Sequence, residues 1–174
     1  MDILNTKELV FNLDSKEIQK IKKIPTTSAI TVQLELSKPM MSLDRTTFTI
    51  STILASFTEE SRSIFPNSKG RVSIILANPD NYIKLTDEKI LNKVLIDLEK
   101  LNFFIKDNLL DYRIIRHENK FYCFSPNNDY LRPNADSGIR GLILAGDYTK
   151  QKMYATMEGA VISGLKAFKF ILDN

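Results

Sequence analysis

The sequence predicts a mixed α+β protein with a mostly antiparallel sheet, and three observations lead to that prediction. Residues 28–36 alternate apolar and polar side chains, as a strand with one buried face does. Isoleucine, leucine and valine recur at helical spacing between Ile90 and Leu101. Residues 141–146 form a short apolar run without alternation, which is typical of a strand covered on both faces.

Length and composition are those of a folded chain that can bury a sizeable core. The chain has 174 residues, of which 43% are hydrophobic and 26% are charged. Its net charge is only +3 and its basic residues are scattered, so nucleic acid is not an expected partner. No stretch approaches the roughly 18 consecutive apolar residues of a membrane helix, and the amino terminus does not resemble a signal peptide.

Cysteine and histidine usage limits the chemistry further. Cys123 is the single cysteine, so an internal disulfide is impossible and a reducing cytoplasm is the expected compartment. With His117 as the single histidine, the chain lacks the ligands of a structural zinc site. Cys123 stands between two aromatic residues, which indicates a small buried side chain.

The first half of the chain begins with a helix signal and continues with strands. Asp14 followed by Glu17 is a capping-box pattern, which predicts a helix over about 15–23. After it, β-branched and alternating segments predict strands, separated by turn residues. These strands are expected at residues 28–36, 46–56 and 72–77, with a short helix or turn at 58–65.

The middle of the chain contains the clearest amphipathic helix. Thr86 precedes two acidic residues, a combination that favours a helix start, and the apolar stripe ends near residue 101. Farther on, the polar pair Glu118-Asn119 separates residues 112–117 from residues 120–124, which predicts a hairpin. A loop over 125–139 is then expected.

The final segment has a pattern that points to ligand binding. A covered strand ending in Gly146-Asp147 precedes a loop and a helix expected over 157–172. A helix start offers unpaired N–H groups and a positive dipole end, which favour an anion or an electron-rich carbonyl. Gly159 has no side chain to block that approach. The alternative is that Gly146-Asp147 is an ordinary turn and that Gly159 and Gly164 serve helix packing.

The final helix also has one apolar face. Small residues at Gly159, Ala160 and Gly164 would let another group approach one side of the helix closely. The apolar face comprises Met157, Ala160, Val161, Gly164, Leu165, Phe168, Ile171 and Leu172.

These residues resemble a known motif. Residues 145–151 (AGDYTKQ) and 155–164 (ATMEGAVISG) closely resemble the carboxyl-terminal flavin motif of the FAD-dependent amine oxidoreductase superfamily. The Tyr-Thr-Lys-Gln form is most similar to phytoene and zeta-carotene desaturases. A looser resemblance includes residues 30–34 and Arg132-Pro133.

The resemblance implies a domain organisation. Residues 1–140 would be a portion like the substrate domain, with an antiparallel sheet and helices. Residues 141–174 would be the carboxyl-terminal strand and helix of an FAD-binding Rossmann-like fold. A family member begins with a βαβ unit that carries G-x-G-x-x-G. The six glycines of this chain do not form that motif, so the amino-terminal dinucleotide-binding unit is expected to be absent.

The resemblance also implies a cofactor and its contacts. FAD is the expected cofactor, and Gly146 and Asp147 would lie against its ribityl and pyrophosphate part. Backbone N–H groups near the pyrimidine edge of the flavin would come from Met157, Glu158, Gly159 and Ala160. No catalytic residue and no metal ligand is predicted. Lys150 and Gln151 are expected to be solvated loop residues, and a role on the substrate side is the alternative.

Three functional hypotheses follow. In the first, the chain is the carboxyl-terminal part of a desaturase-like flavin oxidoreductase that is inactive alone or needs a second chain carrying the dinucleotide-binding half. In the second, it is a non-catalytic module that binds an apolar ligand or a protein partner, with homo-oligomers formed through an exposed sheet edge. In the third, it is an independent small FAD enzyme. A lipophilic substrate and a peripheral membrane location are further expectations.

Overall fold

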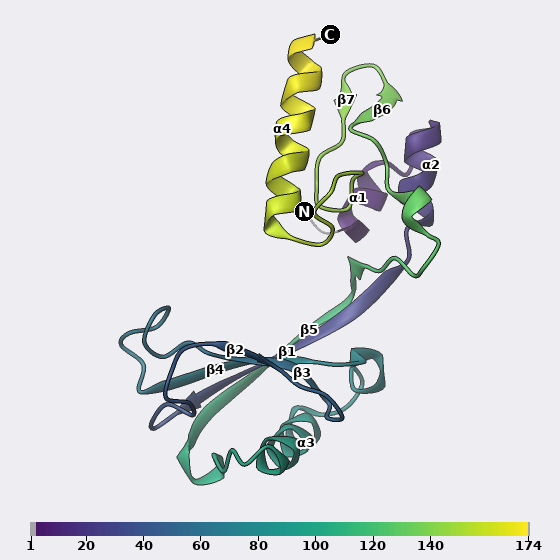
Figure 1. Ribbon diagram of the computed structural model, residues 1–174. Coiled ribbons are helices and arrows are strands. Elements are labelled where there is room, and N and C mark those ends of the chain that lie inside the picture. Colours follow the sequence, from purple (N-terminus) through teal and green to yellow (C-terminus); the bar gives the residue numbers. More distant parts are fainter. Residues whose placement is uncertain (1–2, 174) are drawn as a thin grey trace. The chain divides into compact units, whose positions relative to one another are not determined.

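The computed structural model describes residues 3–173, which fold as two compact units (Figure 1). One unit comprises residues 28–118, and the other combines the chain up to Thr27 with the chain from Asn119 onward. Helices occur together with a mainly antiparallel sheet, so the predicted α+β class is confirmed. The contacts group the amino-terminal helices with the carboxyl-terminal segment, whereas the sequence-based division had placed a boundary at residue 140.

A five-stranded sheet in the order β2-β3-β4-β1-β5 organises the unit of residues 28–118. The pairs β1–β4, β2–β3 and β3–β4 are antiparallel, and Val32 on β1 lies opposite Ile74 on β4. The strands are β1 (Thr26–Leu36), β2 (Thr46–Phe48), β3 (Leu54–Glu59), β4 (Gly70–Leu76) and β5 (Leu109–Tyr122).

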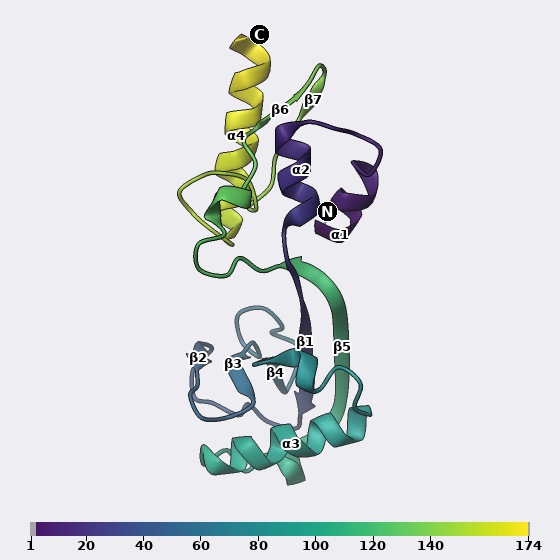
Figure 2. The same ribbon diagram turned by 90° about the vertical axis from the view of Figure 1, so that its right-hand side faces the viewer.

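Helix α3 (Asp87–Lys100) covers one face of this sheet (Figures 1 and 2). It starts where the sequence predicts, because the Thr86 hydroxyl accepts the N–H of Lys89 at 3.4 Å. The strand β1 alternates buried and partly exposed residues, so every second side chain enters the core. The core between helix and sheet includes Ile30, Val32, Leu34, Leu36, Phe57, Val72, Ile74, Ile90, Val94 and Leu98.

The prediction of a single strand over 46–56 is wrong, because the chain reverses direction within these residues. Ile50 is 89% exposed, and Ser51 has a φ of 62°, so the segment forms a turn between β2 and β3. On the far side of that turn, the buried Asp97 carboxylate of α3 accepts the N–H of Ile53 at 2.6 Å. β-branched residues favour extended backbone in general, so their density did not reveal the reversal.

The hairpin expected at residues 112–124 is also wrong. Residues 112–122 belong to β5, which runs without reversal and neighbours β1 in the sheet. Asn119 takes a φ of 52°, a conformation that asparagine tolerates, but the strand continues through it. Pairing with a distant strand therefore overrides the local turn signal.

Apart from the ends of β1 and β5, the described residues of the other unit form three α-helices, two short strands and one 3₁₀ turn. Helix α1 had not been predicted, because its few residues lack a clear apolar stripe. The elements are α1 (Ile3–Leu9), α2 (Lys16–Lys23), β6 (Asp136–Ile139), β7 (Leu142–Ile143) and α4 (Met157–Asp173). Across both units, the 3₁₀ turns found in residues 3–173 are Pro79–Asn81, Lys106–Asn108 and Asp129–Leu131.

Helix α2 confirms the predicted helix but not its predicted cap. Ser15, rather than Asp14, is the N-cap, and its hydroxyl accepts the N–H of Ile18 at 3.2 Å. The Glu17 carboxylate turns away from the cap and accepts the N–H of Asn134 at 2.7 Å. Glu17 therefore ties α2 to the segment that precedes β6, which is a contact between residues distant in the sequence.

The apolar run at 141–146 is not a strand covered on both faces. Only Leu142 and Ile143 form β7, which pairs antiparallel with β6 in a sheet of two strands within the described residues. Leu144 is buried against α2 and its neighbours, whereas Leu142 and Ile143 are half-buried. Beside them lies a hollow of about 700 Å³, bordered by Phe170 and Ile171 of α4. The run is apolar enough for a second covering layer that the described residues do not supply.

A buried carboxylate anchors the loop after β1 in the unit of residues 28–118. Glu59 is almost fully buried, and its Oε2 accepts the N–H groups of Met40 and Met41 at 2.7 and 3.0 Å. Its other oxygen bonds to the Ser61 hydroxyl. The carboxylate thus satisfies backbone donors that burial would otherwise leave unpaired.

We expect Glu59→Ala to lower the free energy of unfolding by about 2–4 kcal/mol, because it leaves buried N–H groups unpaired and opens a cavity. Urea denaturation measures the change. Glu60→Ala, at the neighbouring half-buried position, is the matched control and should cost about 1 kcal/mol or less. Equal losses in the two variants would contradict the anchoring role of Glu59.

Candidate functional site

A hydrogen bond to α4 holds the turn that follows β7. The N–H of Gly146 donates to the Ser163 hydroxyl of α4 at 2.8 Å. Gly146 has a φ of 149°, and a Cβ at this position would lie 2.4 Å from the ring of the buried Tyr148. The Gly146 carbonyl accepts both the N–H and the hydroxyl of Thr149, at 3.0 and 2.7 Å. Only glycine fits this position.

The Asp147 carboxylate has one partner in an aromatic cluster. The Tyr122 hydroxyl, at the end of β5, donates to Asp147 Oδ2 at 2.7 Å. Burial, reinforced by that hydrogen bond and by the charge of Asp147, raises the pKa of Tyr122 above its ordinary value. The tyrosine therefore remains protonated and able to donate across the neutral pH range.

Gln151 organises the loop between Asp147 and α4. The residue is buried, with only 7% of its surface exposed. Its Nε2 donates to the carbonyls of Asp147 and Met153 at 3.0 and 2.9 Å. Its Oε1 accepts the N–H of Met153. The expectation that Gln151 is solvated is wrong, because its amide replaces water as the partner of three backbone groups. Lys150 is exposed, as expected.

Arg132 holds the same loop through its guanidinium group. The residue is only 7% exposed, and its Nη2 donates to the carbonyls of Thr149 and Gln151 at 2.6 and 2.9 Å. Its guanidinium lies 5.4 Å from the ring centre of Tyr154, and its Nη1 contacts Asp129 at 3.2 Å. The sequence had marked Arg132 by resemblance, and its role in the fold is to satisfy carbonyls that would otherwise be buried without donors.

The start of α4 is partly closed by its own loop. Thr156 Oγ1 accepts the N–H of Gly159 at 2.9 Å, and the Thr156 carbonyl accepts that of Ala160 at 3.1 Å. A Cβ on Gly159 would lie 1.9 Å from the Met153 carbonyl oxygen. The glycine is therefore needed for packing against this chain. Met157 and Glu158 are exposed residues of the first turn of α4, where helix geometry leaves N–H groups without a partner inside the helix.

The large apolar side chains of α4 face away from the unit. Its buried residues are Gly159, Ser163 and Ala167, so the small side of the helix is the side in contact with the chain. The predicted apolar face is exposed, with Met157 at 89%. We call this surface the α4 apolar face; its large exposed side chains are Met157, Val161, Leu165, Phe168, Ile171 and Leu172.

The predicted site residues therefore lie close together, although the N–H groups of Gly146, Gly159 and Ala160 already have hydrogen-bond partners within the chain. Gly146 and α4 are linked through Ser163, and Asp147 is linked to the start of α4 through Gln151. The sequence reasoning missed Tyr122, Ser163 and the structural role of Gln151. Ser163 is spaced four residues from both Gly159 and Ala167. This stripe of small residues was the pattern in the sequence that could have identified Ser163 as a contact of α4 with the loop.

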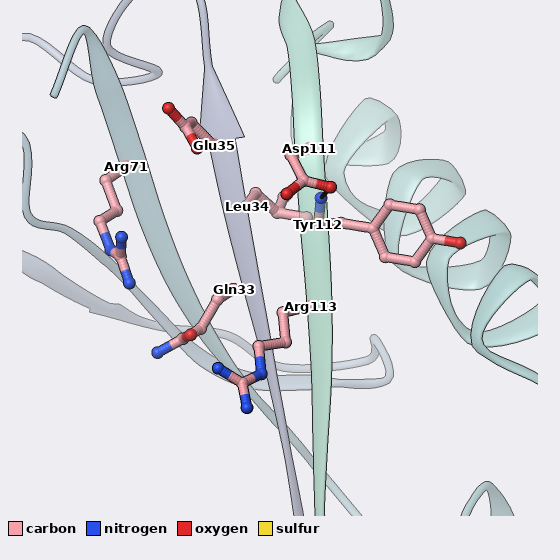
Figure 3. Close-up of a pocket in the computed structure, with 7 residues that line it drawn as sticks. All are labelled: Gln33, Leu34, Glu35, Arg71, Asp111, Tyr112 and Arg113. Carbon is pink, nitrogen blue, oxygen red and sulfur yellow. Dashed lines mark hydrogen bonds between the residues drawn. The ribbon is translucent and has the colours of Figure 1, made fainter.

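A separate hollow of about 200 Å³ lies on the polar face of the five-stranded sheet (Figure 3). Its charged side chains are Glu35, Arg71, Asp111 and Arg113, with Gln33 between the two arginines in Figure 3. The two carboxylates balance the two guanidinium groups, and none of the predicted site residues borders this hollow. Its mixed lining gives no preference for one class of ligand.

The described part of the chain offers neither a metal cluster nor a membrane span. Among residues 3–173, no group of three or more His, Cys, Asp or Glu side chains could hold a metal ion. Within the same residues, no helix has both the length and the apolar character needed to cross a bilayer. Cys123 is exposed, which corrects the expectation of a buried thiol.

Comparison with known families decides the assignment. The family described as flavin containing amine oxidoreductase matches residues 1–168. The chain belongs to this family. The predicted superfamily is thereby confirmed.

Curated relatives of this amine oxidoreductase family member include carotenoid desaturases. A chloroplastic/chromoplastic 15-cis-phytoene desaturase from an Oncidium hybrid cultivar is 31% identical over 187 residues, covering 100% of this chain and 32% of the relative. The 15-cis-phytoene desaturase of Synechococcus elongatus is 28% identical over 154 residues, covering 84% of this chain and 32% of the relative. The chain thus spans about a third of the length of these relatives.

Solved structures agree with the fold. A protein from Exiguobacterium sp. 255-15 gives a TM-score of 0.70 at 13% identity, covering 100% of this chain and 40% of that protein. An oxidoreductase from Methanosarcina mazei gives a TM-score of 0.66 at 16% identity, covering 97% of this chain and 41% of that protein. At these identities the likeness concerns the fold alone.

The residues of this family member fit part of a flavin site. Family membership implies a flavin cofactor by resemblance. Asp147 has a second carboxylate oxygen beside the one that Tyr122 holds, and the first turn of α4 presents the N–H groups of Met157 and Glu158. The N–H groups of Gly159 and Ala160 are already bonded to Thr156. FAD contacts at the six predicted positions stay a prediction.

We expect the two glycines of α4 to respond oppositely to alanine. Gly159→Ala should lower the free energy of unfolding by about 1–3 kcal/mol, because its Cβ would overlap the Met153 carbonyl. Gly164→Ala should raise it by about 0.5–1 kcal/mol, because open space surrounds that position and alanine favours helix. Thermal and urea denaturation measure both. A stabilising Gly159→Ala would contradict the described start of α4.

Proposed function

We propose that this chain contributes the flavin-ring end of an FAD site in an oxidoreductase of the carotenoid desaturase type. One observation carries the proposal: side chains buried in the unit hold the Asp147 turn and the first turn of α4 as a single assembly. Ser163, Gln151 and Arg132 make that assembly rigid before any ligand arrives. A cofactor site needs such preorganised polar groups.

The chain's own residues would bind and orient the cofactor. FAD, when bound, supplies the redox chemistry by accepting electrons from the substrate. The second oxygen of Asp147 would accept a hydroxyl of the cofactor's ribityl part. The N–H groups of Met157 and Glu158, at the positive end of the α4 dipole, would favour negative charge at the flavin edge. A lipophilic substrate, as the names of the desaturase relatives indicate for those proteins, is part of this proposal.

The remaining part of the FAD site would come from a second polypeptide that carries the dinucleotide-binding unit. The α4 apolar face and the half-buried β7 support this idea, because both have the composition of surfaces that another layer covers. The carotenoid desaturase relatives are about three times as long as this chain, so they contain sequence that could form such a layer. The chain alone would then be inactive.

The same surfaces support a second candidate, a non-catalytic module that binds an apolar ligand or a protein partner. The hollow of about 700 Å³ beside β7 has the size of a small-molecule site. The short edge strand β2 could also pair with a second copy of the chain. A monomer in sedimentation experiments that takes up no apolar ligand would count against this candidate.

We propose that the chain is located in the cytoplasm, at the periphery of a membrane. The single cysteine is compatible with a reducing compartment. A lipophilic substrate would be reached at a membrane surface. Fractionation of cells that contain the protein at its natural level would distinguish the soluble fraction from the membrane fraction.

We expect the purified chain not to bind FAD at micromolar concentrations. One helix end contributes only about 1 kcal/mol, far less than the roughly 8 kcal/mol of micromolar affinity. Titration of FAD with the chain, followed by flavin fluorescence, measures this. Saturable quenching at micromolar concentrations would instead support an independent small flavoprotein.

We expect co-expression with a polypeptide encoded beside this chain and carrying G-x-G-x-x-G to yield a yellow complex that retains flavin. Leu165→Glu, on the α4 apolar face, should abolish co-purification, because a charge would be buried in the interface. Lys169→Glu is the control, since it also places a carboxylate on an exposed position of α4. A complex that tolerates both variants would contradict the assigned surface, and a neighbouring region without such a frame would contradict the two-chain proposal.

A further inference from the structure

The hydrogen bond between Tyr122 and Asp147 differs from the other bonds of this loop because it acts on a side chain, and the Asp147 carboxylate makes no other hydrogen bond among the described residues. The backbone around Asp147 has separate anchors. Ser163 holds the N–H of Gly146, Gln151 holds the Asp147 carbonyl, and Arg132 holds the Thr149 carbonyl. Removing the Tyr122 hydroxyl would therefore free the carboxylate and leave the turn in place.

The ring of Tyr122 is itself fixed. Its centre lies 5.5 Å from that of Phe124, 6.4 Å from that of Tyr148 and 5.7 Å from that of Tyr154. These separations and the tilted or edge-on geometries are those of favourable aromatic contacts. Tyr154 in turn lies near the Arg132 guanidinium, at 5.4 Å. These ring contacts consequently hold the Tyr122 hydroxyl in one position, beside Asp147 Oδ2.

We propose that Tyr122 is a positioning residue, whose hydroxyl selects one side-chain rotamer of Asp147 and leaves the second carboxylate oxygen for a ligand hydroxyl. An aspartate without this contact would sample several staggered χ1 wells. The orientation of Asp147 is a property of this chain by itself. The identity of the ligand as FAD rests on the proposed function.

The contact persists through neutral pH. The groups that act on the Tyr122 hydroxyl are Asp147, Tyr154 and Arg132. Burial and Asp147 raise the pKa of Tyr122, so the protonated donor is favoured in the folded chain. The stabilisation is present in full below the unfolded tyrosine pKa of about 10 and is lost as the pH rises through the folded value.

The first test compares Tyr122→Phe with Tyr154→Phe, which removes a hydroxyl from the same cluster without touching Asp147. Three-bond Hα–Hβ couplings of Asp147, measured by NMR on the full chain, report its χ1 rotamers. We expect one rotamer in the unchanged chain and in Tyr154→Phe, and averaged couplings in Tyr122→Phe at unchanged backbone shifts. A single rotamer in Tyr122→Phe would overturn the proposal, as would averaged couplings in the unchanged chain.

A second variant decides the question if Tyr122→Phe fails to fold. Asp147→Asn keeps the shape of the side chain and removes its charge. Burial and Asp147 raise the pKa of both Tyr122 and Tyr148, so the titration is followed for each tyrosine separately through its ring signals in NMR spectra. The Tyr122 signals should titrate at a lower pH in Asp147→Asn than in the unchanged chain. Identical Tyr122 titrations in the two proteins would overturn the proposed contact.

A third measurement separates this inference from the proposed function. In the flavin-retaining complex, Tyr122→Phe should weaken FAD binding by about fivefold, because the carboxylate must be ordered again on binding. Tyr154→Phe should not weaken it. Averaged Asp147 couplings in Tyr122→Phe, together with unchanged FAD affinity, would uphold the positioning role and contradict the assignment of Asp147 to the flavin. Absence of flavin from every complex would count against the proposed function, and the couplings would still decide the role of Tyr122.

Discussion

The loop between β7 and α4 depends on buried polar side chains that satisfy its backbone. Arg132 supplies donors to two carbonyls, Gln151 serves three backbone groups, and Ser163 accepts the N–H at the turn. Without such partners, each buried backbone group would cost about 1–3 kcal/mol, enough to favour solvated alternatives. The backbone of the candidate site follows from this network, because these bonds set where the Asp147 turn and the first turn of α4 lie.

The two sides of α4 illustrate how the same helix serves two packing demands. Its small residues let the loop approach so closely that the Met153 carbonyl occupies the space of a Gly159 side chain. Its large residues remain exposed, and β7 beside them is paired on one edge only within the described residues. Large apolar side chains of a helix are normally buried, because their burial is the main source of stability. Their exposure on α4 is therefore unusual.

Sequence reasoning predicted most of what local pattern controls. Thr86 starts α3, the alternation through residues 28–36 gives β1, and the Gly146-Asp147 motif leads to the family. It did not predict what distant contacts control: Ile53 is bound by Asp97, and β5 continues past Asn119 beside β1. At the site, Gln151 and Tyr122 were missed for the same reason, since their partners become neighbours only after folding.

The exposed thiol at the end of β5 gives the molecule a single chemical handle. Cys123 is the sole cysteine of the chain, its N–H bonds to the Pro25 carbonyl at 2.8 Å, and its side chain is open to solvent. A maleimide dye or a nitroxide would therefore attach at one defined place, on rigid backbone and one residue from Tyr122. Spectroscopic probes can report on the aromatic cluster without any engineered mutation, and storage under air invites covalent dimers unless a reductant is present.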